Sequence, residues 1–153
     1  MNECGIVVCE KTGRWAVAIR RALGGATGLG ETRSWTACLR EARSRPGALV
    51  AVEITPENAE AACLRLTELS LNSPQISVIV LADRRLRPTE WVFREAGAVS
   101  VLFSPDELVR LRPLWQRFVD RLPVVQTPFR EQVWSRLPWT QYATGVSEKV
   151  ASK

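Results

Sequence analysis

The chain has 153 residues, of which 46% are hydrophobic and 24% are charged, a balance typical of one globular domain with its own core. It contains no histidine, so a catalytic triad of the Ser-His type is excluded and the commonest general base is missing. The net charge is +5, but the arginines that carry most of it are spread along the chain, which argues against nucleic acid as the partner.

The cysteines lie far apart and form no CxxC pair, so neither a zinc site nor a disulfide framework is expected. We expect them to be small buried residues of a protein in the reducing cytoplasm. No apolar run approaches the roughly 20 residues that a membrane-spanning helix needs, and the first residues lack the basic region of a secretory signal. The sequence therefore predicts a cytoplasmic protein without a membrane segment. The cysteines are Cys4, Cys9, Cys38 and Cys63.

Short apolar runs rich in β-branched residues alternate with amphipathic helical patterns along residues 5–122. We expect Leu49–Ile54 to form the central strand, because a run that is apolar on both faces belongs in a covered parallel sheet. Thr55-Pro56-Glu57 follows it and is a typical start of a helix. The predicted strands are Gly5–Cys9, 31–35, Leu49–Ile54, 76–82 and 99–103, each followed by a predicted helix.

Successive strand–helix–strand units predict a parallel sheet with right-handed crossovers. We therefore predict an α/β fold of the flavodoxin-like class, with five parallel strands in the order 2-1-3-4-5 and helices on both faces. The glycines of residues 24–30 follow a helix instead of a strand, so they indicate a connection and not a phosphate loop. Residues 1–122 form the predicted domain. Residues 123–153 are aromatic and interrupted by prolines, and we predict a C-terminal tail whose last residues are disordered.

Two segments resemble the receiver domain of response regulators in two-component signalling. Leu49–Ile54 resembles the strand that carries the phosphoacceptor aspartate, and residues 95–105 resemble the family's glycine-alanine turn, fifth strand and lysine-proline end. The resemblance covers residues 5–122 and implies a magnesium-dependent phosphorylation site where the strands end. It also implies a cis peptide bond before Pro105.

The chemistry of that site does not match the family. Phosphoryl transfer to a carboxylate needs a metal and fixed cations, and a thiol is a poor ligand for magnesium. We therefore predict a pseudo-receiver that is not phosphorylated, is not an enzyme, and binds neither a metal nor a cofactor. By the resemblance, the two acids after the first strand fall on Cys9 and Glu10, the phosphoacceptor on Glu53, the hydroxyl residue on Ala82, the lysine on Ser104 and the switch aromatic on Val101.

Glu53 permits two interpretations. Its carboxylate could place a permanent negative charge where a phosphoryl group would sit, or it could pair with Lys11, Arg84 or Arg85 at the edge of the sheet. A mimic of the phosphoryl group must act on an element with two states. Since Ala82 and Val101 occupy the usual switch positions, a fixed scaffold fits the sequence better than a switch.

The remaining function is binding. Trp91 falls on the side of the fourth predicted helix opposite Phe93, so it faces away from the sheet. In receivers this helix, the fifth strand and the last helix form the usual partner surface, and tryptophan is enriched at interface hot spots. We therefore predict an interaction or dimerisation module in signalling or transcriptional regulation. The tail either covers Trp91 or reaches a second subunit. The predicted interaction residues are Trp91, Val101, Phe129, Trp134 and Trp139.

Two other functions remain open from the sequence. A small-molecule or nucleotide-binding module would use backbone donors at Thr12-Gly13 in a crevice at the strand ends. An enzyme would use Glu10 and Glu53 as an acid–base pair, although no nucleophile or oxyanion site accompanies them. The crevice of the binding module would consist of Glu10, Thr12, Gly13, Glu53, Thr55 and Asp83.

Overall fold

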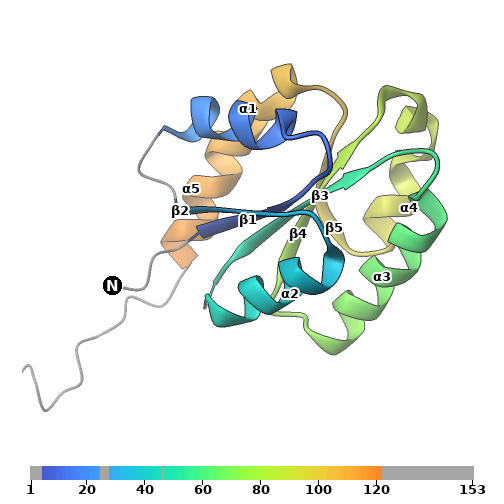
Figure 1. The fold of residues 1–153 in the computed structure, drawn as a ribbon, viewed down its shortest axis with the longest axis horizontal. Helices are drawn as coiled ribbons and strands as arrows, with labels where there is room; N and C mark the ends of the chain where they lie inside the picture. Colours follow the sequence, from blue (N-terminus) through green and yellow to red (C-terminus); the bar gives the residue numbers. More distant parts are fainter. Residues whose placement is uncertain (1–4, 25–27, 46, 122–153) are drawn as a thin grey trace, which may run out of the picture. The chain divides into compact units, whose positions relative to one another are not determined.

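The computed structural model describes residues 5–24, 28–45 and 47–121. Five parallel strands form one sheet in the order β2-β1-β3-β4-β5, as the sequence predicted (Figure 1). The strands are β1 (Gly5–Cys9), β2 (Gly28–Thr32), β3 (Leu49–Ile54), β4 (Ser77–Ala82) and β5 (Ala98–Leu102). The α-helices are α1 (Arg14–Leu23), α2 (Trp35–Ser44), α3 (Ala59–Asn72), α4 (Glu90–Glu95) and α5 (Leu111–Arg121), with 3-10 helices η1 (Arg84–Thr89) and η2 (Pro105–Arg110).

Helices cover both faces of the sheet, with α1 and α5 on one side and α2, α3 and α4 on the other (Figure 1). The central strand β3 supplies both cores because successive side chains of a strand point to opposite faces. Leu49 and Ala51 pack toward α1 and α5, whereas Val50 and Val52 pack toward α2 and α3. The apolar run predicted to be central is therefore covered on both faces.

The structure shifts one predicted strand. β2 begins at Gly28, inside the glycine-rich segment, and ends at Thr32, whereas the sequence placed it at residues 31–35. Pairing with β1 outweighs the low strand propensity of glycine, since each residue of β2 has a partner in Gly5–Cys9. Glycine at position 5 permits this approach, because a Cβ there would lie 2.6 Å from the carbonyl oxygen of Gly28.

The fourth and fifth helices begin as 3-10 helix, which the sequence did not predict. Pro88 lies inside η1, and proline offers no N–H for a helical hydrogen bond, so the regular helix α4 starts only at Glu90. η2 in the same way precedes α5. The cis peptide bond expected before Pro105 is a wrong prediction, because the described residues contain no cis peptide bond.

None of the helices in the described ranges combines the length and the apolar character that crossing a bilayer requires. The predicted tail, with Phe129, Trp134 and Trp139, lies outside the described residues, as does Cys4.

Gly97 makes the turn between α4 and β5 with φ of 108°, a conformation that side chains disfavour. A Cβ there would also lie 2.8 Å from the Cβ and the Oγ of Ser70 in α3. We expect Gly97→Ala to lower the free energy of unfolding by about 2 kcal/mol, from backbone strain and overpacking together. Gly13→Ala should cost only the strain, about 1 kcal/mol, because no atom would lie within 4 Å of its new Cβ. Urea denaturation measures both losses of unfolding free energy. Equal losses for the two variants would contradict a steric contribution from the contact with Ser70.

Candidate functional site

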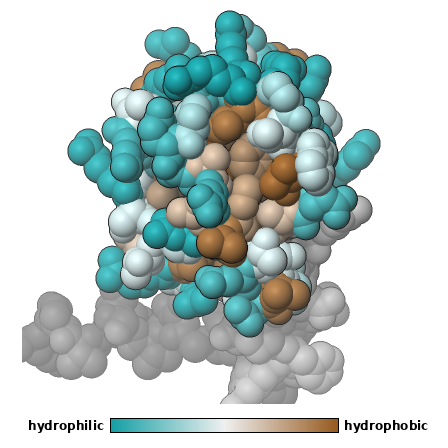
Figure 2. Space-filling model, turned by 90° about the vertical axis from the view of Figure 1, so that its right-hand side faces the viewer, coloured by the Kyte–Doolittle hydropathy of each residue, from teal (hydrophilic) through white to brown (hydrophobic). Residues whose placement is uncertain are grey.

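The carboxyl ends of the five strands meet at one edge of the sheet, which is where open α/β folds keep their ligand sites. Figure 2 looks onto the right-hand side of Figure 1, and apolar surface gathers in the middle of that face within a ring of hydrophilic side chains. Five of the positions that the receiver resemblance singles out lie within two residues of a strand end: Cys9, Glu10, Glu53, Ala82 and Ser104.

Glu10 follows β1 and is only 6% exposed. Its carboxylate accepts hydrogen bonds from the backbone N–H groups of Trp15 (2.9 Å) and Ala16 (2.7 Å), which open α1. The residue before α1 is Gly13, whose backbone is left-handed and which has no side chain for a cap. Glu10 therefore supplies the cap of α1, and its negative charge suits the positive end of the helix.

Glu53, on β3, is held by the loop between β1 and α1. Its carboxylate accepts hydrogen bonds from the backbone N–H of Lys11 (2.8 Å) and from the hydroxyl of Thr12 (3.0 Å). The predicted ion pair of Glu53 is wrong for the described residues, because none of their salt bridges includes it. The loop offers main-chain and hydroxyl donors closer to the carboxylate than any cationic side chain.

The arginines after β4 bind elsewhere. The side chain of Arg85 donates both its Nε (3.1 Å) and its Nη2 (3.2 Å) to the carboxylate of Asp83. This pairing, with the backbone N–H of Arg85, lowers the pKa of the Asp83 carboxyl to about 2. The carboxylate of Asp83 therefore stays ionised and is paired with Arg85.

Arg84 is a site residue whose role sequence reasoning missed. Its guanidinium donates a hydrogen bond of 3.1 Å to the hydroxyl of Ser104, the position where receivers carry a lysine. A cation thus stands at the buried Ser104 although no lysine is present, and it comes from η1 instead of from the end of β5. The two consecutive arginines directly after a buried strand were the available signal in the sequence.

The site does not fit a magnesium ion. Among the residues that the structure describes, no three histidine, cysteine or acidic side chains lie close enough together to hold a metal. Glu10 and Glu53 point their oxygens at different groups, one at the start of α1 and the other at the β1–α1 loop. Magnesium needs several hard oxygen ligands in near-octahedral geometry, which this arrangement does not supply.

A cavity of about 590 Å³ lies beside these residues, between the β1–α1 loop and the starts of α2 and α3. It contains most of the crevice predicted for a small-molecule site, namely Glu10, Thr12, Glu53 and Thr55, but neither Gly13 nor Asp83. Sequence reasoning did not predict its remaining walls, because they come from the end of β1, the loop after β2 and the helices α2 and α3, which only the fold brings together. These walls include Arg33, Trp35 and Arg65 together with Cys9.

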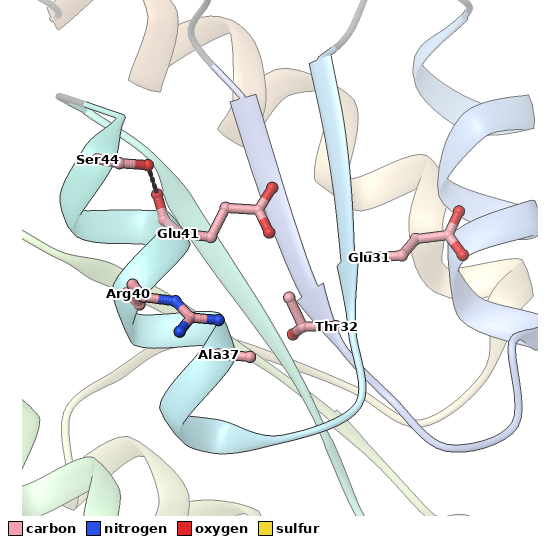
Figure 3. A pocket seen from close by; sticks show the side chains of 6 residues that line it. All are labelled: Glu31, Thr32, Ala37, Arg40, Glu41 and Ser44. Carbon is pink, nitrogen blue, oxygen red and sulfur yellow. Dashed lines mark hydrogen bonds between the residues drawn. The ribbon is translucent and has the colours of Figure 1, made fainter.

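A second hollow, of about 470 Å³, lies between α2 and β2 (Figure 3). Glu41 of α2 extends its carboxylate toward the strands and pairs with Arg45 at 2.7 Å. The missing side chain of Gly30 makes the space for this carboxylate, since a Cβ there would collide with it. This ion pair joins α2 to its own C-terminal cap, and Arg45 in turn donates a hydrogen bond of 3.3 Å to the carbonyl oxygen of Gly28, which fastens the end of α2 to the edge strand β2.

The cysteines differ from the buried residues that the sequence predicted. Cys38 is buried, but Cys9 and Cys63 are only partly buried. Hydrogen bonding from Cys38 and, to a smaller extent, from Thr32 outweighs the effect of burial and lowers the pKa of the Cys9 thiol to about 7. The contact with Cys9, together with burial, raises the pKa of Cys38.

The predicted interaction residues fall into two environments. Trp91 is 67% exposed on α4, and Val99 on β5 and Val109 on η2 are further exposed apolar residues. Val101, by contrast, is 4% exposed and belongs to the core between the sheet and α2, α3 and α4. Val101 therefore lies beneath the predicted surface and is not part of it, because the alternation of β5 turns its side chain inward.

No protein-family model matches this chain, and no curated protein matches it. Solved structures do match. A CheY-like protein, TadZ, from Pseudomonas aeruginosa is 17% identical, with a TM-score of 0.64 over 80% of this chain and 98% of that one. A putative pilus assembly-related protein from Burkholderia pseudomallei is 16% identical, with a TM-score of 0.59 over 82% of this chain and 96% of that one.

An orphan response regulator of H. pylori is 19% identical, with a TM-score of 0.55 over 80% of this chain and 98% of that one. These likenesses, together with the strand order, assign the chain the CheY-like receiver fold. The resemblance drawn from residues 5–122 is thereby confirmed for the fold.

Proposed function

We propose that this chain is a pseudo-receiver, a receiver fold that is not phosphorylated and acts by binding another protein or a second copy of itself. One observation carries the first half of the proposal: both acids of the site are engaged by main-chain or hydroxyl donors. Glu10 caps α1, and Glu53 holds the β1–α1 loop. The phosphoryl chemistry of receivers needs these oxygens free for a metal.

The surroundings support the same proposal. Cys9 stands where receivers have an acid, and Ala82 offers no hydroxyl. Arg84 already donates to Ser104, so this cation serves a contact within the chain. Glu10 and Glu53 also face different groups, which argues against the acid–base pair of an enzyme. We therefore extend the proposal to a chain that is not an enzyme, located in the cytoplasm.

The exposed apolar residues support the binding half. Trp91 and Val99 lie on α4 and β5, which pack against each other at the β5 edge of the sheet, and Val109 lies on η2, which follows β5. A tryptophan that exposes two thirds of its surface leaves a large apolar area in water, and such residues are enriched at interface hot spots. We propose that this surface, called the α4–β5 surface below, is the contact for a partner protein or for self-association. An orphan response regulator and a putative pilus assembly-related protein have a similar fold, so the fold alone does not name the partner.

Acetyl phosphate tests the first half. We expect the full chain to take up no phosphoryl group from acetyl phosphate with magnesium, as measured by intact-mass spectrometry. The proposed site holds no magnesium ion that could neutralise the charge on the oxygens of the phosphoryl group. Isothermal titration with magnesium should show no binding. A receiver domain with its acids and lysine intact serves as the positive control. A phosphorylated Glu53 or a magnesium complex would overturn this half of the proposal.

A second candidate function rests on the 590 Å³ cavity, whose volume falls within the range of small-molecule sites. Arg33 and Arg65 could face the phosphates of a nucleotide, and Trp35 could pack on its base. A thermal-shift series with nucleoside mono-, di- and triphosphates tests this candidate. A rise in the melting temperature that Arg65→Gln abolishes would favour it over the pseudo-receiver without ligand.

A further inference from the structure

Two cysteines from distant parts of the chain meet on one face of the sheet. Cys9 ends β1 and points to the same side as Val7, toward the core that holds Cys38 of α2. Cys38 is fully buried behind it, whereas Cys9 keeps part of its surface. The pair therefore has an outer and an inner member.

Cys9, the outer of the two cysteines, borders a cavity. Cys9 is one of the residues that line the 590 Å³ cavity between the β1–α1 loop, α2 and α3. A small molecule that enters this cavity reaches the sulfur of Cys9 before it can reach that of Cys38. Cys63 of α3, the other partly buried cysteine of the described residues, does not line this cavity.

Three cationic and three acidic side chains line the cavity, but two of the acids, Glu10 and Glu53, accept hydrogen bonds from backbone N–H groups that offset their charge. The balance that remains favours a thiolate at Cys9 and an anionic ligand. Arg65 of α3 acts on Cys9 directly and lowers its pKa, after the larger effect of the Cys38 thiol, and the opposing carboxylate is that of Glu53. Glu53 is already hydrogen-bonded to the β1–α1 loop. The remaining charged groups that line the cavity are Lys11 and Arg33 on the positive side, and Glu10, which caps α1, and Glu57 on the negative side.

We propose that Cys9 is a thiol modification site that takes anionic low-molecular-weight disulfides from this cavity, and that Cys38 is its resolving thiol. This inference is independent of the pseudo-receiver proposal, because it uses neither a metal nor the α4–β5 surface.

The chemistry balances in two exchanges. The Cys9 thiolate attacks one sulfur of the small disulfide, a mixed disulfide forms on Cys9, and one small thiolate leaves. Cys38 then attacks the sulfur of Cys9, which forms the Cys9–Cys38 bond, and the proton of Cys38 passes to the second small thiolate, which leaves as a thiol. The small disulfide is reduced by two electrons, and the cysteine pair is oxidised by two. The product ties the end of β1 to α2.

Oxidised glutathione and cystamine, an anionic and a cationic disulfide, test the proposal on the full chain. At pH 7 we expect oxidised glutathione to modify Cys9 about fivefold faster than Cys63, whose thiol pKa is raised by burial. Peptide mapping of the wild-type chain should find a Cys9–Cys38 disulfide. Cys38→Ser should instead accumulate the mixed disulfide on Cys9. Cys38→Ala, which also removes the hydrogen-bond donor at this position, should in addition move the pH midpoint of Cys9 alkylation up from about 7.

Arginine variants separate the charge of the cavity from the reactivity of the thiol. Arg65→Gln should slow oxidised glutathione about threefold relative to cystamine, whereas Arg43→Gln, an exposed change on α2 outside the cavity, should slow neither. A reaction at Cys63 as fast as at Cys9, a stable mixed disulfide on Cys9 of the wild-type chain, or equal effects of the two arginine variants would overturn the proposal.

Discussion

Replacing Glu10 with alanine is expected to lower the free energy of unfolding by about 3 kcal/mol, because two backbone N–H groups at the start of α1 lose a charged acceptor. The carboxylate is buried and binds Trp15 and Ala16 at 2.9 and 2.7 Å. No other cap replaces it, since Gly13 has no side chain. Urea denaturation followed by circular dichroism measures the loss.

Two variants control for this effect. Glu10→Gln keeps an acceptor oxygen of similar shape but removes the charge, so its loss should be about half that of the alanine variant. Glu68→Ala changes an exposed acid on α3 and should alter stability by no more than about 0.5 kcal/mol. If Glu10→Ala were as stable as Glu68→Ala, Glu10 would not be a cap. Its carboxylate would then be free for metal chemistry, and the pseudo-receiver proposal would lose its main support.

Trp91→Ala is expected to weaken binding to the partner by about 2 kcal/mol, or roughly 30-fold in the dissociation constant, because it removes the largest apolar side chain from the α4–β5 surface. The fold should survive the change, since the side chain is 67% exposed. Sedimentation velocity of the full chain over a range of concentrations measures self-association. A pull-down from the native host with the wild-type chain as bait supplies a candidate partner, whose affinity is then measured directly.

Leu71→Ala is the matched control. Leu71 is 77% exposed on α3, outside the α4–β5 surface, and its loss should leave association unchanged. If the two variants associated equally well, Trp91 would be an ordinary exposed residue and the binding half of the proposal would fall. A loss with Trp91→Ala alone would locate the interface without any assumption about phosphorylation.

The periodicity of the sequence predicted the order and type of the main elements, because burial imposes its pattern directly on the chain. The run Leu49–Ile54 has no polar face and had to be central, and the structure covers it on both sides. The residues at which the elements begin and end were predicted less accurately. The β2 strand starts at Gly28 because β1 is its neighbour, which no local pattern reveals. The 3-10 turns before α4 and α5 also escaped prediction.

The positions of the site residues could be predicted, but their hydrogen-bond partners could not. The resemblance to receiver domains, laid over the predicted strands, placed Cys9, Glu10, Glu53, Ala82 and Ser104 near the ends of strands, where the structure has them. It did not predict which group each side chain would bind. Glu53 accepts from Lys11 through the backbone and not through the ammonium group. A carboxylate after a strand has many donors within reach, and the path of the following loop selects among them.

By itself, then, the amino-acid order determined a parallel five-stranded sheet and the loss of the residues that receivers use, since both follow from residue type and spacing. Only the tertiary structure decided that Glu10 caps a helix, that Arg84 stands at Ser104, and that Cys9 borders a cavity with Cys38 buried behind it. These contacts join segments between five and thirty residues apart, and their geometry depends on how whole helices pack on the sheet. Packing is a property of the assembled core, and no local stretch of sequence encodes it.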